Sequence, residues 1–202
     1  ATIMRDGNTI CTVDMQHVGI QDIIRHMVGH ELTEQFPKID VPIGDVLFKA
    51  EGITRKGVLD QVGFEVHAGE ILGICGLVGA GRTETMRAIF GVDPKNSGKV
   101  YVDGKEVRIS RPGDAIAAGI GFVTEDRKNE GLVLCRDCKE NISLVALRKY
   151  EQFVHVNLKK ERNGCQEYVK KLNIKTPSLF QKVFNLSGGN QQKAIVAREI
   201  DR

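Results

Sequence analysis

A glycine-rich loop between an apolar run and a helical pattern constrains the fold of this chain more than any other feature. The apolar run at residues 71–75 is typical of a buried parallel strand, and the apolar spacing of residues 83–90 predicts a helix that Gly91 ends. Residues 76–83 read Gly-Leu-Val-Gly-Ala-Gly-Arg-Thr, the spacing of a phosphate-binding loop. Glycines let successive N–H groups point into one concavity, where the following helix adds its positive end. A glycine-rich turn without a ligand is the alternative interpretation.

Two side chains of this loop carry separate predictions. Thr83 is placed to bind Mg²⁺ through its hydroxyl. Arg82 stands where the pattern asks for lysine, and its guanidinium is longer, planar and forked. Because phosphoryl transfer needs tight positioning of the phosphate, the sequence predicts nucleotide binding here and leaves hydrolysis open.

A second anion site is predicted at residues 186–193, which read Leu-Ser-Gly-Gly-Asn-Gln-Gln-Lys. It combines the Ser187 hydroxyl, glycine N–H groups and the start of a closing helix over residues 191–200. Taken alone, the motif could equally be a helix N-cap formed by Ser187 or Asn190. The phosphate loop upstream favours the nucleotide site.

The composition excludes several classes of protein. Of 202 residues, 41% are hydrophobic and 27% are charged, as in ordinary globular proteins, and the net charge of +3 is dispersed, so a nucleic-acid partner is not predicted. Five irregularly spaced cysteines disfavour a secreted disulfide scaffold. Cys135 and Cys138 have the spacing of a metal or redox pair, but no second pair completes a zinc site. No apolar run approaches the ~20 residues of a membrane-spanning helix.

Periodicity and turn residues predict the remaining elements. We expect a hairpin across residues 2–14, turning at 6–8, and a helix at 21–27 that Gly29 could close. The proline-bearing stretch 36–42 reads as an extended linker and a domain boundary. Beyond it the patterns predict strands at 46–50, 62–66 and 120–124, a hairpin at 99–109, a helix at 110–118 and a helical region at 139–172.

The two anion motifs resemble those of ATP-binding cassette proteins, and the resemblance covers nearly the whole chain. It is carried by Gly-Glu-Ile-Leu-Gly at 69–73, the loop at 76–83, Glu-Asp-Arg-Lys at 125–128, Gly-Leu at 131–132, Glu-Asn at 140–141 and the signature at 186–193. These motifs are similar to the second cassette of ribose- and galactose-type importers. That cassette often has arginine in its phosphate loop and often ends its signature in Asn-Gln-Gln-Lys.

The resemblance implies an α/β fold, a P-loop NTPase of the ABC type. It would have a mixed sheet, an antiparallel β subdomain and a helical subdomain at about residues 126–185, and would lack its C-terminal part. Residues 1–40 would be the end of a preceding cassette and a linker, and residues 41–202 a truncated second nucleotide-binding domain. The catalytic residues are expected beyond Arg202, so none is assigned here, and the sheet is expected to lack a central strand.

The resemblance also implies a function, that of the ATP-binding subunit of an importer. As a transport ATPase at the cytoplasmic face of the membrane, the parent protein would couple ATP binding and hydrolysis to uptake of a monosaccharide; the fragment alone would be inactive. Its partners would be transmembrane permease subunits, the other nucleotide-binding domain of the same chain and, indirectly, a solute-binding protein. An importer of nucleosides or other small solutes, and a regulatory, non-hydrolysing nucleotide-binding module, remain as alternatives.

The implied cofactors are ATP and Mg²⁺, with ATP held between the phosphate loop of one cassette and the signature of the other. Glu125 falls near the family's lid glutamine and would reach Mg²⁺ together with Thr83. The residues expected to bind the nucleotide are Gly76, Gly79, Ala80, Gly81, Arg82, Thr83, Glu84, Ser187, Gly188, Gly189 and Asn190.

Overall fold

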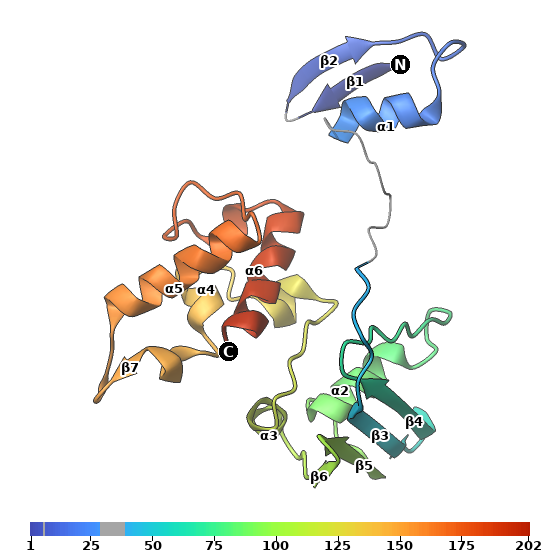
Figure 1. Cartoon of the computed structure of the whole chain (residues 1–202), viewed down its shortest axis with the longest axis vertical. Coiled ribbons are helices and arrows are strands. Elements are labelled where there is room, and N and C mark those ends of the chain that lie inside the picture. The colour runs from blue at the N-terminus through green and yellow to red at the C-terminus, as the bar shows by residue number, and fades with distance from the viewer. Residues whose placement is uncertain (6, 29–38) are drawn as a thin grey trace. The chain divides into compact units, whose positions relative to one another are not determined.

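A computed structural model describes residues 1–5, 7–28 and 39–202, which form two compact units, Ala1–Pro42 and Ile43–Arg202 (Figure 1). In the first unit, β1 (Thr2–Arg5) pairs antiparallel with β2 (Asn8–Thr12), and α1 (Ile20–Val28) packs on this hairpin. The predicted hairpin and helix are therefore confirmed. The predicted turn at Asp6, the helix stop at Gly29 and the first part of the predicted linker lie outside the described residues.

A four-stranded antiparallel sheet begins the second unit. Its strands lie in the order β4 (Leu59–His67), β3 (Val46–Arg55), β5 (Ser97–Val102) and β6 (Lys105–Val107). Two helices, α2 (Arg82–Phe90) and α3 (Pro112–Ala117), bury small and apolar side chains in the same core. Burial of this apolar surface, among it Ile53, Val100 and Ile89, holds the sheet and α2 together.

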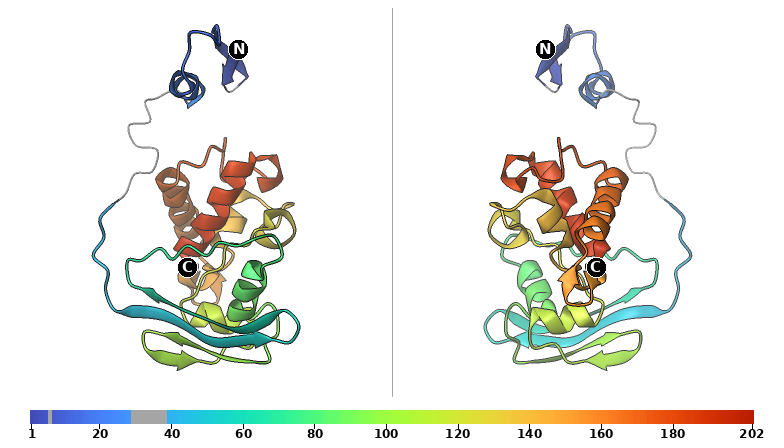
Figure 2. Two further views of the ribbon diagram at one scale, coloured as in Figure 1. Left: turned by 90° about the vertical axis from the view of Figure 1, so that its right-hand side faces the viewer. Right: turned by 90° about the vertical axis from the view of Figure 1, so that its left-hand side faces the viewer.

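The rest of the second unit is mainly helical and lies on one side of that sheet (Figure 2). Its elements are η1 (Arg127–Gly131), α4 (Cys138–Ser143), η2 (Leu147–Tyr150), β7 (Glu151–Gln152), β8 (His155–Val156), α5 (Leu158–Lys171), η3 (Val183–Asn185) and α6 (Gly188–Asp201). Cys165 and Val169 of α5 pack against α4 and α6 in a second core, as the predicted apolar face requires. The predicted helical region at 139–172 is nevertheless interrupted by the β7–β8 hairpin.

Two of the predicted strands are wrong. Residues 71–75 and 120–124 have no strand structure, and the first of these segments is exposed to solvent, with Ile71 98% accessible. A parallel strand needs a neighbour that supplies its hydrogen bonds, and within the described chain no strand pairs with either segment. The apolar run therefore remains an extended segment that leads into the phosphate loop.

A buried polar network fixes the last turn of α6. The Asp201 carboxylate is fully buried and accepts a hydrogen bond from the Tyr150 hydroxyl. The hydroxyl oxygen lies 2.5 Å from Asp201 Oδ1 and 2.6 Å from Oδ2. Lys149 donates through Nζ to Asp201 Oδ1 at 2.9 Å and to its carbonyl oxygen at 2.8 Å. Burial first, and the Asp201 carboxylate second, raise the pKa of Tyr150, so its phenol remains a hydrogen-bond donor. The network ties the signature helix α6 to η2.

Candidate functional site

The predicted phosphate loop runs directly into helix α2, with Gly81 as the residue before its first turn. Gly79 and Gly81 have φ angles of 82° and 81°, in the left-handed region where glycine is favoured. Gly81 is buried against β4, and a Cβ atom added to it would lie 3.1 Å from Leu59 Cδ2. Thr85 donates to the Gly81 carbonyl from its backbone nitrogen at 2.9 Å and from its hydroxyl at 2.7 Å. These contacts anchor the end of the loop to the folded core.

The other predicted ligands of this loop surround the start of α2. Gly76 lies close to Ala80, since a Cβ atom on Gly76 would come within 3.0 Å of the Ala80 Cβ. Arg82 and Thr83 are exposed in the first turn, where Glu84 also stands. The first turn of a helix presents N–H groups that have no partner within the helix. The loop therefore offers the open amides that a phosphate group needs.

The two predicted metal ligands lie together although they are far apart in the sequence. Thr83 donates through Oγ1 to Glu125 Oε2 at 3.1 Å. Arg82 lies beside them in a cavity of about 280 Å³ that Ile74, Met86, Phe122 and Val123 also line. A hydroxyl and a carboxylate are oxygen ligands of the kind that Mg²⁺ prefers. The donor set therefore fits a magnesium ion beside the phosphate loop.

The predicted signature lies at the start of α6, which begins at Gly188 rather than at residue 191. Asn190 Nδ2 donates to the exposed Ser187 hydroxyl at 2.9 Å, and the Asn190 side-chain oxygen accepts the backbone N–H of Lys175 at 2.9 Å. Gln191 is buried and donates through Nε2 to the Val183 carbonyl at 3.0 Å. Asn190 and Gln191 thus hold the helix start in place, while open space lies in front of Gly189.

The segment 124–131 contacts the helices of both motifs. At one end, the Thr124 hydroxyl donates to Glu130 Oε2 at 2.7 Å, and the Glu130 carboxylate forms an ion pair with Arg87 of α2. At the other end, Arg198 of α6 donates through Nη1 to the Gly131 carbonyl at 2.6 Å. The Thr124 hydroxyl first, and Arg87 second, hold the pKa of Glu130 below its usual value. The segment is therefore tied to both the helix after the phosphate loop and the signature helix.

Arg87 also belongs to a cluster of ion pairs that no sequence motif predicted. Its Nη2 lies 3.1 Å from Asp93 Oδ1, and Arg55 donates through Nη1 to Asp93 Oδ2 at 2.7 Å. Arg87 first, and Arg55 second, hold the pKa of the Asp93 carboxyl below its usual value. The partners come from β3, α2 and the residues after α2, so only the folded chain brings them together.

The two cysteines of the predicted pair differ in their exposure. Cys138 is buried at the start of α4, where burial raises the pKa of its thiol to about 11, whereas Cys135 is exposed. Among the residues that the structure describes, His, Cys, Asp and Glu side chains form no group of three or more that is arranged to hold a metal ion. In the same residues, no helix has the length and the apolar character needed to cross a membrane.

Comparisons with known proteins identify import ATP-binding proteins as relatives of this chain. Two curated relatives are a putative ribose/galactose/methyl galactoside import ATP-binding protein of Rhizobium etli and a ribose import ATP-binding protein of Rubrobacter xylanophilus. The first is 48% identical over 197 residues, which are 98% of this chain and 38% of the relative. The second is 46% identical over 200 residues, which are 99% of this chain and 40% of the relative. The chain thus spans about two fifths of the length of these relatives.

The comparison with solved structures shows the fold of an ATP-binding cassette. A solved dimeric ATP-binding cassette bound to ADP and Pi superposes with a TM-score of 0.64 at 23% identity, covering 77% of this chain and 69% of that one. This likeness confirms the predicted α/β fold of the cassette type. The ABC transporter family matches residues 59–202, a span that contains both the phosphate loop and the signature. The chain therefore belongs to the ABC transporter family.

Proposed function

We propose that this chain is part of the ATP-binding subunit of an importer that takes up a monosaccharide. The observation that carries the proposal is the pair of anion motifs, each built at the start of a helix, α2 and α6, in a cassette fold. The names of the relatives, which describe ribose and galactose import, supply the class of solute. Residues 41–202 would form the second nucleotide-binding domain, and residues 1–40 would belong to the preceding cassette and the linker.

In this proposal, residues 76–84 bind the phosphates of ATP. The N–H groups of the loop and of the first turn of α2 contact phosphate oxygens, and Arg82 adds its positive charge. Thr83 and Glu125 hold Mg²⁺, which neutralises charge on the phosphates when it is bound. The second motif, at Ser187, Gly188, Gly189 and Asn190, serves the ATP held by the other nucleotide-binding domain of the same chain.

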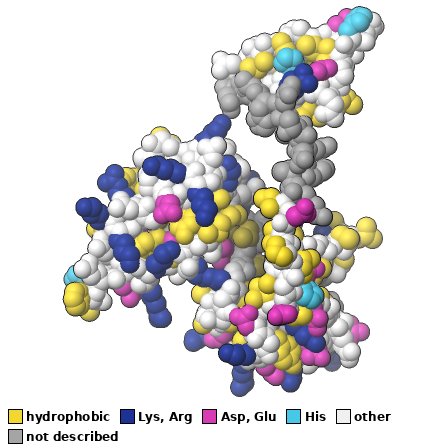
Figure 3. Space-filling view, viewed as in Figure 1, with side chains coloured by type: hydrophobic (Ala, Val, Ile, Leu, Met, Phe, Trp, Pro, Cys, Tyr) yellow, Lys and Arg dark blue, Asp and Glu magenta, His cyan; other side chains and the backbone are white. Residues whose placement is uncertain are grey.

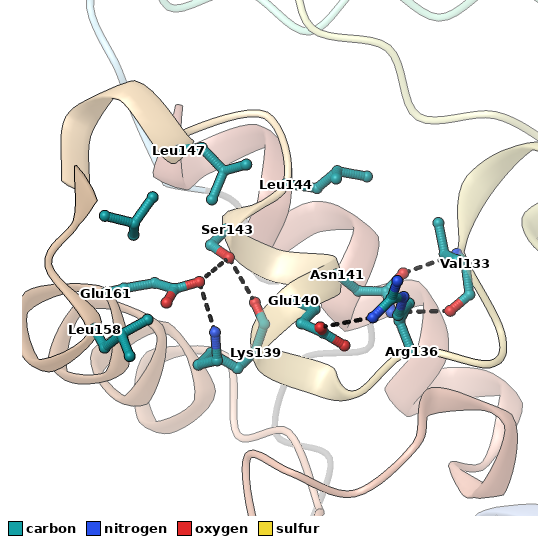
Figure 4. Close-up of a pocket in the computed structure, with 11 residues that line it drawn as sticks. Val133, Arg136, Lys139, Glu140, Asn141, Ser143, Leu144, Leu147, Leu158 and Glu161 are labelled. Atoms are coloured by element: carbon teal, nitrogen blue, oxygen red, sulfur yellow. Dashed lines mark hydrogen bonds and ion pairs between the residues drawn. The ribbon is translucent and has the colours of Figure 1, made fainter. Parts of the chain in front are cut away.

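A cavity in the helical part supports a contact with the transmembrane permease subunits. It has a volume of about 370 Å³ and lies between α4, η2 and α5 (Figure 4). Lys139 and Glu161 form an ion pair of 2.7 Å in it, and both side chains are largely shielded from solvent. The exposed apolar side chains of Leu144, Leu147 and Leu158 surround this pair. Exposed apolar side chains gathered beside a cavity suit a protein partner, so we place the permease contact here, at the cytoplasmic face of the membrane.

On the face drawn in Figure 3, the surface charge gives no support to a nucleic-acid partner. In the face drawn in Figure 3, the Lys and Arg side chains are scattered over the second unit and form no continuous tract. Nucleic-acid interfaces instead gather basic side chains along one face.

A regulatory module that binds ATP without hydrolysing it is the second candidate function. It is favoured by Arg82, which replaces the compact charge of lysine, and by Glu125, whose carboxylate lies beside the predicted phosphate position. In such a module, ATP at this loop would hold the two cassettes together while the other site turns over.

The first test is equilibrium binding of Mg-ATP to the full-length subunit by isothermal titration. Absence of binding would refute the proposal. Substitution in the full-length subunit then separates the two candidates. If the site at the loop turns over, Arg82→Ala and Ser187→Ala should each lower ATP turnover, because the first weakens the site of this domain and the second weakens the opposite site. Unchanged turnover in Arg82→Ala with reduced turnover in Ser187→Ala would favour the regulatory module.

A further inference from the structure

The side chain of Arg127 lies directly against the first glycine of the signature. A Cβ atom added to Gly188 would lie 2.9 Å from Arg127 Nη2 and 3.2 Å from both Cζ and Nη1. The guanidinium therefore lies against the Gly188 α-carbon. No local pattern joins the two residues, because η1 and the start of α6 are far apart in the sequence.

Among the described residues, Arg127 has no polar partner for its charge. Within the described ranges 1–5, 7–28 and 39–202, its guanidinium makes no ion pair or hydrogen bond, although it is half-buried. The neighbouring acid does not neutralise it, because the Asp126 carboxylate accepts the backbone N–H groups of Lys128 and Asn129, at 3.1 Å and 3.0 Å, and the Asn129 amide at 2.7 Å. A partly desolvated cation with unused donors is costly unless a ligand supplies the acceptors.

The main chain around Arg127 is held at both ends, which fixes the point from which its side chain extends. Asp126 caps η1 at its start, and Arg198 of the signature helix binds the Gly131 carbonyl at its end. Glu130 adds the ion pair with Arg87 of α2. A planar, forked cation beside the open amides of a helix start matches the geometry of a phosphate group.

We propose that Arg127 binds the terminal phosphate of the ATP molecule that the signature contacts. Its guanidinium would add a side-chain charge to the Ser187 hydroxyl and to the amides of Gly188 and Gly189. The inference rests on the proposed function, because it assumes that the signature contacts ATP held by the other cassette. It adds a specificity for the triphosphate, since ADP lacks the phosphate that Arg127 would bind.

The test measures equilibrium binding of ATPγS and of ADP, each with Mg²⁺, to the full-length subunit. Arg127→Gln removes the charge and should weaken ATPγS binding about tenfold or more, while ADP binding changes less than about twofold. Arg127→Lys keeps the charge and should recover most of the lost affinity. Lys128→Gln is the matched control, because it removes a positive charge from the neighbouring exposed position and should leave both affinities unchanged.

Ser187→Ala distinguishes failure of this inference from failure of the proposed function. If Ser187→Ala weakens ATPγS binding and Arg127→Gln does not, the signature binds ATP and the inference about Arg127 is wrong. An equal loss of ATPγS and ADP in Arg127→Gln would also overturn it, because the arginine would then serve the structure of the site. If neither Ser187→Ala nor Arg127→Gln changes ATPγS binding, the nucleotide role of the signature fails, and the inference fails with it.

Discussion

Replacing Tyr150 by phenylalanine removes one oxygen atom from the buried network at the end of α6 and leaves the ring in place. That oxygen donates to the fully buried Asp201 carboxylate, which keeps Lys149 as its remaining partner. A hydrogen bond to a charged group contributes about 1.5–3 kcal/mol, so the free energy of unfolding should fall by that amount. For a domain of this size, such a loss lowers the melting temperature by roughly 3–12 °C.

Urea unfolding followed by circular dichroism measures this loss, and an unchanged dependence of the free energy on urea would show that the same surface is exposed on unfolding. Tyr168→Phe is the matched control, because the Tyr168 hydroxyl lies 3.5 Å from the Ile200 carbonyl at an exposed position. It should change the free energy by less than about 0.5 kcal/mol. Equal effects of Tyr150→Phe and Tyr168→Phe would refute the conclusion that the network stabilises α6.

Two further predictions concern charged groups in the second unit. Arg87 holds the pKa of Asp93 below its usual value. The stability that this carboxylate adds is therefore present above its ordinary pKa of about 4 and is lost as the pH falls through the lower pKa of the folded state. In Asp93→Asn, the free energy of unfolding should fall less steeply with decreasing pH than in the wild type. Glu161→Gln leaves the Lys139 ammonium without its buried partner and should destabilise the protein by about 3–5 kcal/mol in urea unfolding, whereas Glu140→Gln, at a more exposed ion pair, should cost less than about 1 kcal/mol.

Features encoded by short stretches of the chain were predicted well. The helix after the phosphate loop begins one residue before its predicted start and ends at Gly91, which has the left-handed conformation that glycine tolerates. The face of α5 that carries Cys165 and Val169 is buried as its spacing requires. In each case neighbouring residues contain the whole signal, through helix periodicity or a glycine at a helix end.

Features that depend on distant partners could not be predicted. Residues 71–75 have the composition of a buried strand, but no neighbouring strand pairs with them in the described chain. The ion pair of Arg87 with Glu130 and the contact of Arg127 with Gly188 join residues that no local pattern relates. The pairing of Thr83 with Glu125 was expected only through the resemblance, because nothing in either segment alone indicates the other.

The exposed segment before α2 also has a consequence for the behaviour of the protein in solution. From Ile71 to Ala80 the chain carries neither a charge nor a proline, the two features that most readily prevent a strand from pairing with a copy of itself. An uncharged apolar stretch that is open to water favours self-association between molecules. Any strand that pairs with it in the working protein therefore prevents aggregation as well as setting the position of the phosphate loop.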